Sequence, residues 1–148
     1  MKRTKAFLML PLMLLIALAA GAPDEAMGRV SKVVDDDTFD VTVTEVVDSR
    51  VMVDDVIRIR LADIDTPEVR GKKACEAGKV ASAYTKKWLM SRAVTLDLDD
   101  KTGKDEFGRW VAVCYLDGKN FNRQLVDAGQ AVVKDFKNNE FDPKSWWN

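Results

Sequence analysis

The stretch Val56-Ile57-Arg58-Ile59-Arg60-Leu61-Ala62-Asp63-Ile64-Asp65-Thr66-Pro67-Glu68 begins as a strand and ends as a turn. Every second residue from Ile57 to Leu61 is apolar, which is the period of a half-buried β-strand, and Arg58 and Arg60 belong to the opposite face. Pro67 then breaks the strand, because proline cannot donate to a ladder. The turn therefore gathers an arginine, two carboxylates and a hydroxyl where a strand leaves its sheet.

The same alternation recurs along the chain and predicts the other strands and their order. With Val56–Ala62 as the third strand, the strands are Arg29–Val34, Phe39–Thr44, Val94–Asp99 and Trp110–Leu116. A turn is expected at Asp48-Ser49, and no element is assigned from Lys134 onward. This order predicts an α+β fold: a β-barrel with helices, namely a five-stranded OB-fold Greek-key barrel with one helix after strand three and one or more after strand five.

Helical periodicity appears twice, at Glu76–Ser91 and at Phe121–Ala128. In the first helix we expect Ala77, Val80, Ala81, Tyr84 and Trp88 to pack on the core and the lysines to face solvent. In the second, Asn120 is a candidate N-cap, and Gly129 lies just past the end.

The first twenty residues resemble a secretory signal peptide, with a basic start, an apolar run and small residues after it. We expect residues 1–20 to be removed, by cleavage near 19–22, and residues 28–148 to form one domain. The alternative is a retained anchor, although the run from Ala6 to Ala20 is short for a bilayer span. The expected location is periplasmic or extracellular, with no membrane association after cleavage.

Composition restricts the chemistry. The 148-residue chain has a formal net charge of −1, and loss of three basic residues with the signal peptide makes it −4. A broad basic surface for nucleic acid is therefore not expected, and an anionic substrate must be held by a few arginines, with or without a metal cation. The chain has no histidine, which excludes a histidine base, nucleophile or metal ligand.

The two cysteines, Cys75 and Cys114, have no zinc-site spacing. A disulfide is permitted in an oxidising compartment, and two buried free thiols are equally compatible with the sequence.

Three polar clusters stand at predicted strand ends: Asp35-Asp36-Asp37-Thr38, Arg60 with Asp65-Thr66-Pro67-Glu68, and Asp105-Glu106-Phe107-Gly108-Arg109. Together they resemble the staphylococcal-type thermonuclease (micrococcal nuclease-like) family, which carries Asp-Gly-Asp-Thr, Arg-x4-Asp-Thr-Pro-Glu and Asp-x-Tyr-Gly-Arg segments in this order. The resemblance runs from about Val30 to Val133. It implies the five-stranded barrel that periodicity already predicts.

The resemblance implies a calcium site and a phosphodiesterase centre. Asp37 and Asp65 match carboxylates that bind Ca²⁺, with the Thr66 backbone carbonyl as a further ligand. A hard cation takes such oxygen ligands.

For catalysis, Glu68 matches the general base that activates water, and Arg60 and Arg109 match the pair that holds the scissile phosphate. The implied function is a secreted, calcium-dependent nuclease that hydrolyses DNA and RNA phosphodiester bonds and leaves 3′-phosphates. No stable protein partner is implied, and a monomer is expected. The alternative is a catalytically silent OB-fold module that binds single-stranded nucleic acid.

The chain departs from the family pattern at several positions. Asp36 replaces the usual glycine, which adds a negative charge near the expected metal, and Phe107 replaces the usual tyrosine. Asp135 and Lys137 stand where family members often carry tyrosines. The segment Phe141–Trp147 is expected to cap the core in place of a long C-terminal helix.

Overall fold

The computed structural model describes residues 25–47, 49–71 and 75–148. The expected signal peptide at residues 1–20 and Asp48 of the expected turn lie outside the described residues. The main elements are β1 (Ala26–Val33), β2 (Thr38–Val46), β3 (Val56–Leu61), α1 (Glu76–Leu89), β5 (Ala93–Leu98), β6 (Trp110–Leu116) and α2 (Phe121–Asp127).

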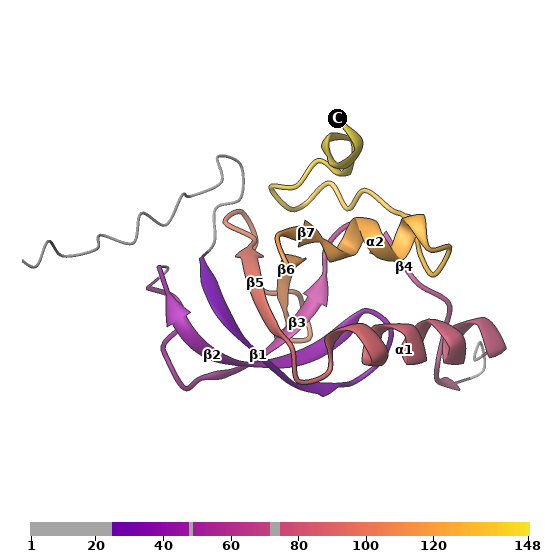
Figure 1. The fold of residues 1–148 in the computed structure, drawn as a ribbon. Coiled ribbons are helices and arrows are strands. Elements are labelled where there is room, and N and C mark those ends of the chain that lie inside the picture. The colour runs from indigo at the N-terminus through magenta and orange to yellow at the C-terminus, as the bar shows by residue number, and fades with distance from the viewer. Residues whose placement is uncertain (1–24, 48, 72–74) are drawn as a thin grey trace, which may run out of the picture.

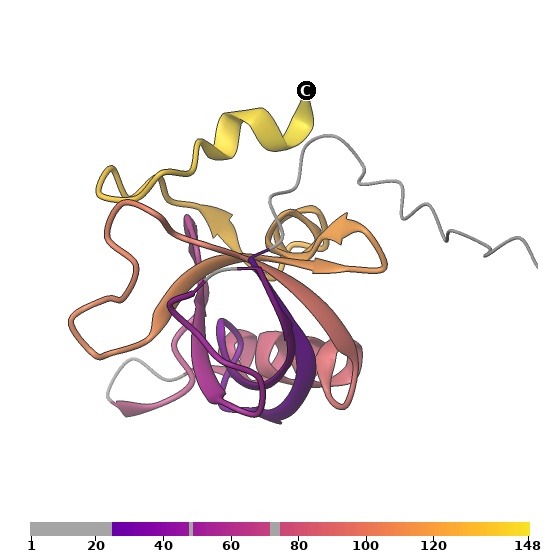
Figure 2. The same cartoon turned by 90° about the vertical axis from the view of Figure 1, so that its left-hand side faces the viewer.

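Five of the strands form the predicted barrel. Their order is β3-β2-β1-β5-β6, each pair antiparallel, and a parallel pairing between β3 and β6 closes the sheet on itself. Strand β1 pairs with both β2 and β5 and has register irregularities after Met27 and after Val30. Bulges of this kind increase the local bend and twist of a strand, which closure of a small barrel needs. Figure 2 shows the strands curving round, with the coil of α1 behind them.

Among the described residues, four short elements were not predicted: β4 (Ile64–Asp65), β7 (Lys119–Asn120), β8 (Val132–Val133) and the 3₁₀ helix η2 (Pro143–Trp147). Two-residue strands are too short to show a period. The start of η2 has a recognisable signal, because the Asp142 side chain accepts a hydrogen bond from the Lys144 N–H at 3.1 Å and proline follows the cap. In Figure 1 the tail that carries η2 lies beside α2.

The core fills the barrel and continues under both helices. Trp146 of η2 packs against this core, as expected for a capping tail. The largest fully buried side chains are Val30, Phe39, Val41, Val43, Ile59, Leu61, Ile64, Leu89, Leu96, Leu98, Phe121 and Leu125.

The buried face of α1 differs from the predicted one. It consists of Gly78, Ala81, Thr85 and Leu89. Of the predicted stripe, Ala81 is buried and Tyr84 is half-buried, but Ala77, Val80 and Trp88 are exposed. The prediction of the core-facing stripe was therefore wrong by about one residue of helix rotation.

Two close approaches explain this rotation. A β-carbon on Gly78 would lie 2.1 Å from the Glu68 carbonyl oxygen, so only glycine lets the helix meet that loop. The Thr85 hydroxyl donates to the Asp36 carbonyl at 2.7 Å, which satisfies a polar group inside the core. Gly78 and Thr85 thus occupy buried positions of α1 at which helical periodicity predicts larger apolar side chains.

Helix α2 is fixed at its start and along its buried side. The Asn120 side chain accepts a hydrogen bond from the Arg123 N–H at 3.0 Å, which confirms the predicted N-cap. Asn122, fully buried, accepts from the Cys114 N–H at 3.1 Å and donates to the Ala62 carbonyl at 3.0 Å. The second bond joins α2 to the segment that follows β3 and carries the expected site.

Both cysteines are free thiols, Cys75 exposed and Cys114 buried. Burial raises the pKa of the Cys114 thiol far above its usual value. Within the described ranges, no helix has both the length and the apolar character needed to cross a membrane.

Candidate functional site

The barrel brings the first two polar clusters together through its strand register. Thr38, the first residue of β2, pairs with Arg60 near the end of β3. Arg60 also pairs with Val111 of β6, which follows the third cluster by two residues. Segments far apart in sequence therefore meet at one end of three neighbouring strands.

Asp37 is the centre of the hydrogen-bond network at this end. Its Oδ1 accepts from the Thr38 hydroxyl at 2.8 Å, and its Oδ2 accepts from the Thr66 hydroxyl at 3.0 Å. Arg60 Nη2 lies 3.3 Å from the same Oδ2. Burial alone would raise the pKa of the Asp37 carboxyl, but the Arg60 charge and these hydrogen bonds hold it below its usual value. Asp37 therefore stays ionised.

Arg109 joins the network through Thr38. Its Nη1 donates to the Thr38 hydroxyl oxygen at 3.3 Å, so that this hydroxyl connects Arg109 to Asp37. The Arg109 Nε donates to Asp105 Oδ2 at 2.8 Å, and the guanidinium stands 5.3 Å from the centre of the exposed Phe107 ring. Asp105 also accepts from the Arg109 backbone N–H at 3.0 Å. The side chain is thus fixed in orientation by its own loop.

Arg60 and Arg109 line a single pocket of about 450 Å³. Arg60 also donates to the Leu61 carbonyl and, at 3.1 Å, to the Ile64 carbonyl, which shapes the turn after β3. Phe107 and Phe136 contribute apolar surface to the pocket wall. The pocket offers two guanidinium groups beside aromatic rings, a combination suited to a phosphate attached to a flat ring.

The other two predicted side chains, Asp65 and Glu68, lie on the same turn but are exposed. Asp65 pairs with Val132 through the backbone of β4 and β8. Among the described residues, no hydrogen bond or ion pair joins the Asp65 or Glu68 carboxylate to the Asp37 network. The Glu68 carbonyl accepts from the Cys75 N–H at 3.1 Å, so the start of α1 fixes the backbone of Glu68.

Oxygen ligands for a metal converge in the loop before β2. One carboxylate oxygen from each of Asp35, Asp36 and Asp37 lies within 4.8 Å of the others. Burial, together with the neighbouring carboxylates, raises the pKa of Asp36 to about 7 and that of Asp35 to about 6. Asp36 Oδ2 is buried and has no hydrogen-bond partner. An oxygen-only cluster with an unpartnered buried atom fits a hard cation such as Ca²⁺.

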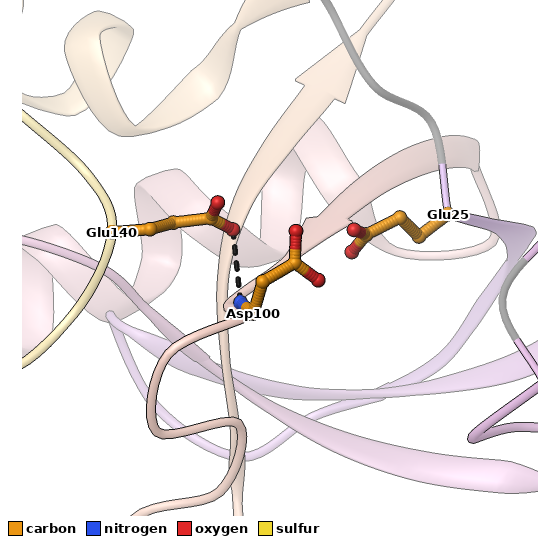
Figure 3. Close-up of side chains that lie close together, drawn as sticks. All are labelled: Glu25, Asp100 and Glu140. Atoms are coloured by element: carbon orange, nitrogen blue, oxygen red, sulfur yellow. Dashed lines mark hydrogen bonds between the residues drawn. The ribbon is translucent and has the colours of Figure 1, made fainter.

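A second acidic cluster serves as a comparison within the molecule. Figure 3 shows Glu25, Asp100 and Glu140, from three separate segments, with Glu140 accepting from the Asp100 N–H at 3.0 Å. Arg50 lies 2.9 Å from Asp100 and 3.4 Å from Glu25. Burial, with the neighbouring Asp100, raises the pKa of Glu25 to about 8. This cluster already contains a cationic side chain that bridges two of its members.

Sequence reasoning missed residues that position the site. The motif that contains Thr38 gives no indication of its role, but the Thr38 hydroxyl contacts both Asp37 and Arg109. Asp105 lies in the third motif and orients Arg109, which the sequence does not show. Their place inside the motifs was the available signal.

The C-terminal tail is attached to the site by Asp63, a residue outside the three motifs. Asp63 is fully buried, and its Oδ1 accepts from the Asn139 amide at 2.8 Å and from the Phe136 N–H at 3.0 Å. Burial raises the pKa of this carboxyl. A charged residue inside an otherwise alternating strand end was the signal that could have indicated a buried partner.

Comparison with known proteins agrees with the motif resemblance. Residues 58–145, more than half of the chain, match the model of the family described as staphylococcal nuclease homologue. The chain is 38% identical over 85 residues to a thermonuclease of Staphylococcus intermedius. This alignment covers 56% of this chain and 50% of the thermonuclease. It is 32% identical over 106 residues to the SPbeta prophage-derived endonuclease YokF of Bacillus subtilis. This alignment covers 70% of this chain and 33% of YokF.

The chain is also similar to a protein whose name does not describe a nuclease. The succinoglycan biosynthesis protein ExoI of Rhizobium meliloti is 30% identical over 133 residues, covering 84% of this chain and 61% of that protein. The chain thus spans between a third and about three fifths of the length of these relatives. The family match includes Arg60, Glu68 and Arg109 and starts after Asp37. With its closed five-stranded barrel and this match over more than half of its residues, the chain belongs to the staphylococcal nuclease homologue family.

Proposed function

We propose that this protein is a calcium-dependent nuclease that hydrolyses phosphodiester bonds of DNA and RNA. The observation that carries the proposal is the connection between Arg60 and Arg109. Both side chains line one pocket, and the Asp37–Thr38 pair joins them through an ion pair and two hydrogen bonds. Two guanidinium groups held in fixed positions can neutralise a phosphate whose charge is redistributed during the reaction.

The residues have separate roles in this proposal. Arg109 binds the phosphate through the guanidinium nitrogen that neither Asp105 nor Thr38 occupies, Nη2. The exposed Glu68 accepts a proton from the attacking water. A bond forms between the water oxygen and phosphorus, and the bond to the 5′-oxygen breaks. The 5′-oxygen takes a proton from solvent as it leaves, a 3′-phosphate remains, and Glu68 returns its proton to solvent.

Asp37, Asp65 and the Thr66 carbonyl would hold the calcium ion, as the family resemblance implies. The ion would supply positive charge next to the phosphate oxygens. The Thr66 hydroxyl supports this placement, because its bond to Asp37 holds the turn after β3 against the loop before β2. Asp65 projects from the same turn into solvent, where an approaching substrate can reach it.

Export is part of the proposal and rests on the sequence of residues 1–20. We propose a periplasmic or extracellular location and action as a monomer. Amino-terminal sequencing of the protein recovered from its native host tests this, since an amino terminus near residue 20 is expected and an intact terminus would contradict it.

The activity is tested with supercoiled plasmid and with single-stranded RNA as substrates. We expect cleavage in calcium, its loss in excess calcium chelator, and its survival with a zinc-selective chelator. End-group analysis should find 3′-phosphates. Binding of oligonucleotides without cleavage in calcium would reject the nuclease and favour the silent binding module. Full cleavage in excess calcium chelator would reject the calcium requirement alone.

A further inference from the structure

Asp36 is a buried carboxyl group, and one of its two oxygens has no partner among the described residues. Only 3% of the residue is exposed, and its Oδ2 has no hydrogen-bond partner. A buried oxygen without a partner is unfavourable, so such an atom is usually hydrogen-bonded or bound to a cation. In the family pattern this position is a glycine, which has no side chain to bury.

The neighbours of Asp36 add further negative charge beside it. Its carboxylate lies within 4.8 Å of those of Asp35 and Asp37. Among the described residues, the ion pair found in this cluster is that between Arg60 and Asp37. The cluster therefore holds three carboxylates, and the one that forms this ion pair is Asp37, not Asp36.

The second acidic cluster shows the arrangement that a purely structural cluster adopts in this protein. There Arg50 reaches two of the three carboxylates, Glu25 and Asp100. Two of that cluster's members, Asp100 and Glu140, are exposed to water. In the Asp35–Asp37 cluster the central residue, Asp36, is buried instead. Water and protein cations therefore stabilise the negative charge of this cluster less.

We propose that Asp36 is an additional carboxylate ligand of the calcium ion, which the glycine of the family pattern cannot supply. The inference rests on the proposed function and deepens it. A site with one more carboxylate carries more negative charge, and the affinity of oxygen sites for Ca²⁺ rises with the number of charged ligands. This chain should therefore bind calcium more tightly than its own variant with glycine at this position.

Thr85 positions Asp36 for this role. Its hydroxyl, fully buried in α1, donates to the Asp36 backbone carbonyl at 2.7 Å. This bond fixes the peptide from which the Asp36 side chain projects. Thr85 touches no part of the phosphate pocket, so it acts through the geometry of the loop and not on the substrate.

The experiment is calcium titration by isothermal calorimetry, without nucleic acid, on the parent, Asp36→Asn and Asp36→Gly. Both variants should bind Ca²⁺ about tenfold more weakly or worse, since each removes a charged ligand. Glu140→Gln, which removes a carboxylate from the other cluster, is the matched control and should bind like the parent. Circular dichroism and thermal unfolding without calcium check that each variant is folded.

The role of Thr85 is tested by Thr85→Val and Thr85→Ser in the same titration. Loss of affinity in the valine variant and its recovery in the serine variant would support positioning through the hydroxyl. Equal calcium affinity in the parent and the valine variant would overturn the positioning role of Thr85.

Two results would overturn the assignment of Asp36: parental affinity in Asp36→Asn, or no calcium binding by the parent. Plasmid cleavage is measured separately on the same samples. A protein that cleaves and binds calcium but does not respond to Asp36→Asn retains its proposed function and loses only this ligand.

Discussion

The carbonyl oxygen of Glu68 lies where a side chain on Gly78 would begin. A β-carbon built on Gly78 would stand 2.1 Å from that oxygen and 3.1 Å from the Pro67 carbonyl oxygen. Cys75 donates its backbone N–H to the same Glu68 oxygen. The first turns of α1 and the turn that carries the proposed base are thus packed without space for one further carbon atom.

Gly78→Ala should therefore disturb both stability and catalysis. Alanine favours a helix by about 1 kcal/mol over glycine, but overpacking a site with backbone atoms costs roughly 1–3 kcal/mol. We expect a net loss of stability and a fall in turnover, because Glu68 must move with its backbone. Urea unfolding and plasmid cleavage measure the two effects. Lys79→Ala, at an exposed position of the same turn, is the control and should change neither.

The hydroxyl of Thr38 connects the metal loop to Arg109, so its removal should separate them. Thr38→Val keeps the shape of this buried side chain and deletes its bonds to Asp37 and Arg109. Hydrogen bonds to charged groups are worth about 1.5–3 kcal/mol, which corresponds to a turnover roughly ten- to a hundredfold lower. Thr38→Ser should recover most of the rate. Equal cleavage by the valine variant and the parent would show that the connection has no catalytic role.

The strands could be predicted because their signal is local. The alternation of apolar and polar residues predicts that Phe39, Val41 and Val43 lie on the side of β2 that faces the core. All three are buried in the structure. The same argument holds for Ile57, which lies on the inner side of β3. The closed barrel follows from five such strands in this order.

The face of α1 and the hydrogen bonds of the site could not be predicted from local patterns. Gly78 and Thr85 are inside because of what they meet in other segments, Glu68 and Asp36. The bond from Arg109 to Thr38 spans 71 positions of the chain. Motifs placed these residues in the same region, but only the folded barrel determines which atoms bond.

Stability should depend on pH through Glu25. Burial raises the pKa of this carboxyl from 4.5 to about 8, so between these values the folded protein holds a proton that the unfolded chain releases. Stability from this group is therefore present at low pH and is lost as the pH rises from about 4.5 to about 8. Glu25→Gln should flatten the fall of the melting temperature over this interval.

The measurement is calorimetric unfolding at a series of pH values between 5 and 8, without calcium. Glu76→Gln removes a carboxylate of the same type from the exposed start of α1 and serves as control. The comparison of each variant with the parent isolates the contribution of one group. An identical slope in the parent and Glu25→Gln would contradict the prediction.

The proposed roles of Glu68 and Arg109 predict different kinds of loss. Glu68→Gln keeps the size of the side chain and removes its basicity, so turnover should fall roughly 10²–10⁴-fold while affinity for a nucleotide analogue stays near that of the parent. Arg109→Ala should lower both turnover and affinity, because the guanidinium lines the pocket and carries the charge that binds phosphate. Steady-state cleavage and analogue binding, measured on both variants with circular dichroism as a check of folding, separate the two effects. Parental cleavage rates in both variants would place the active site elsewhere on the barrel.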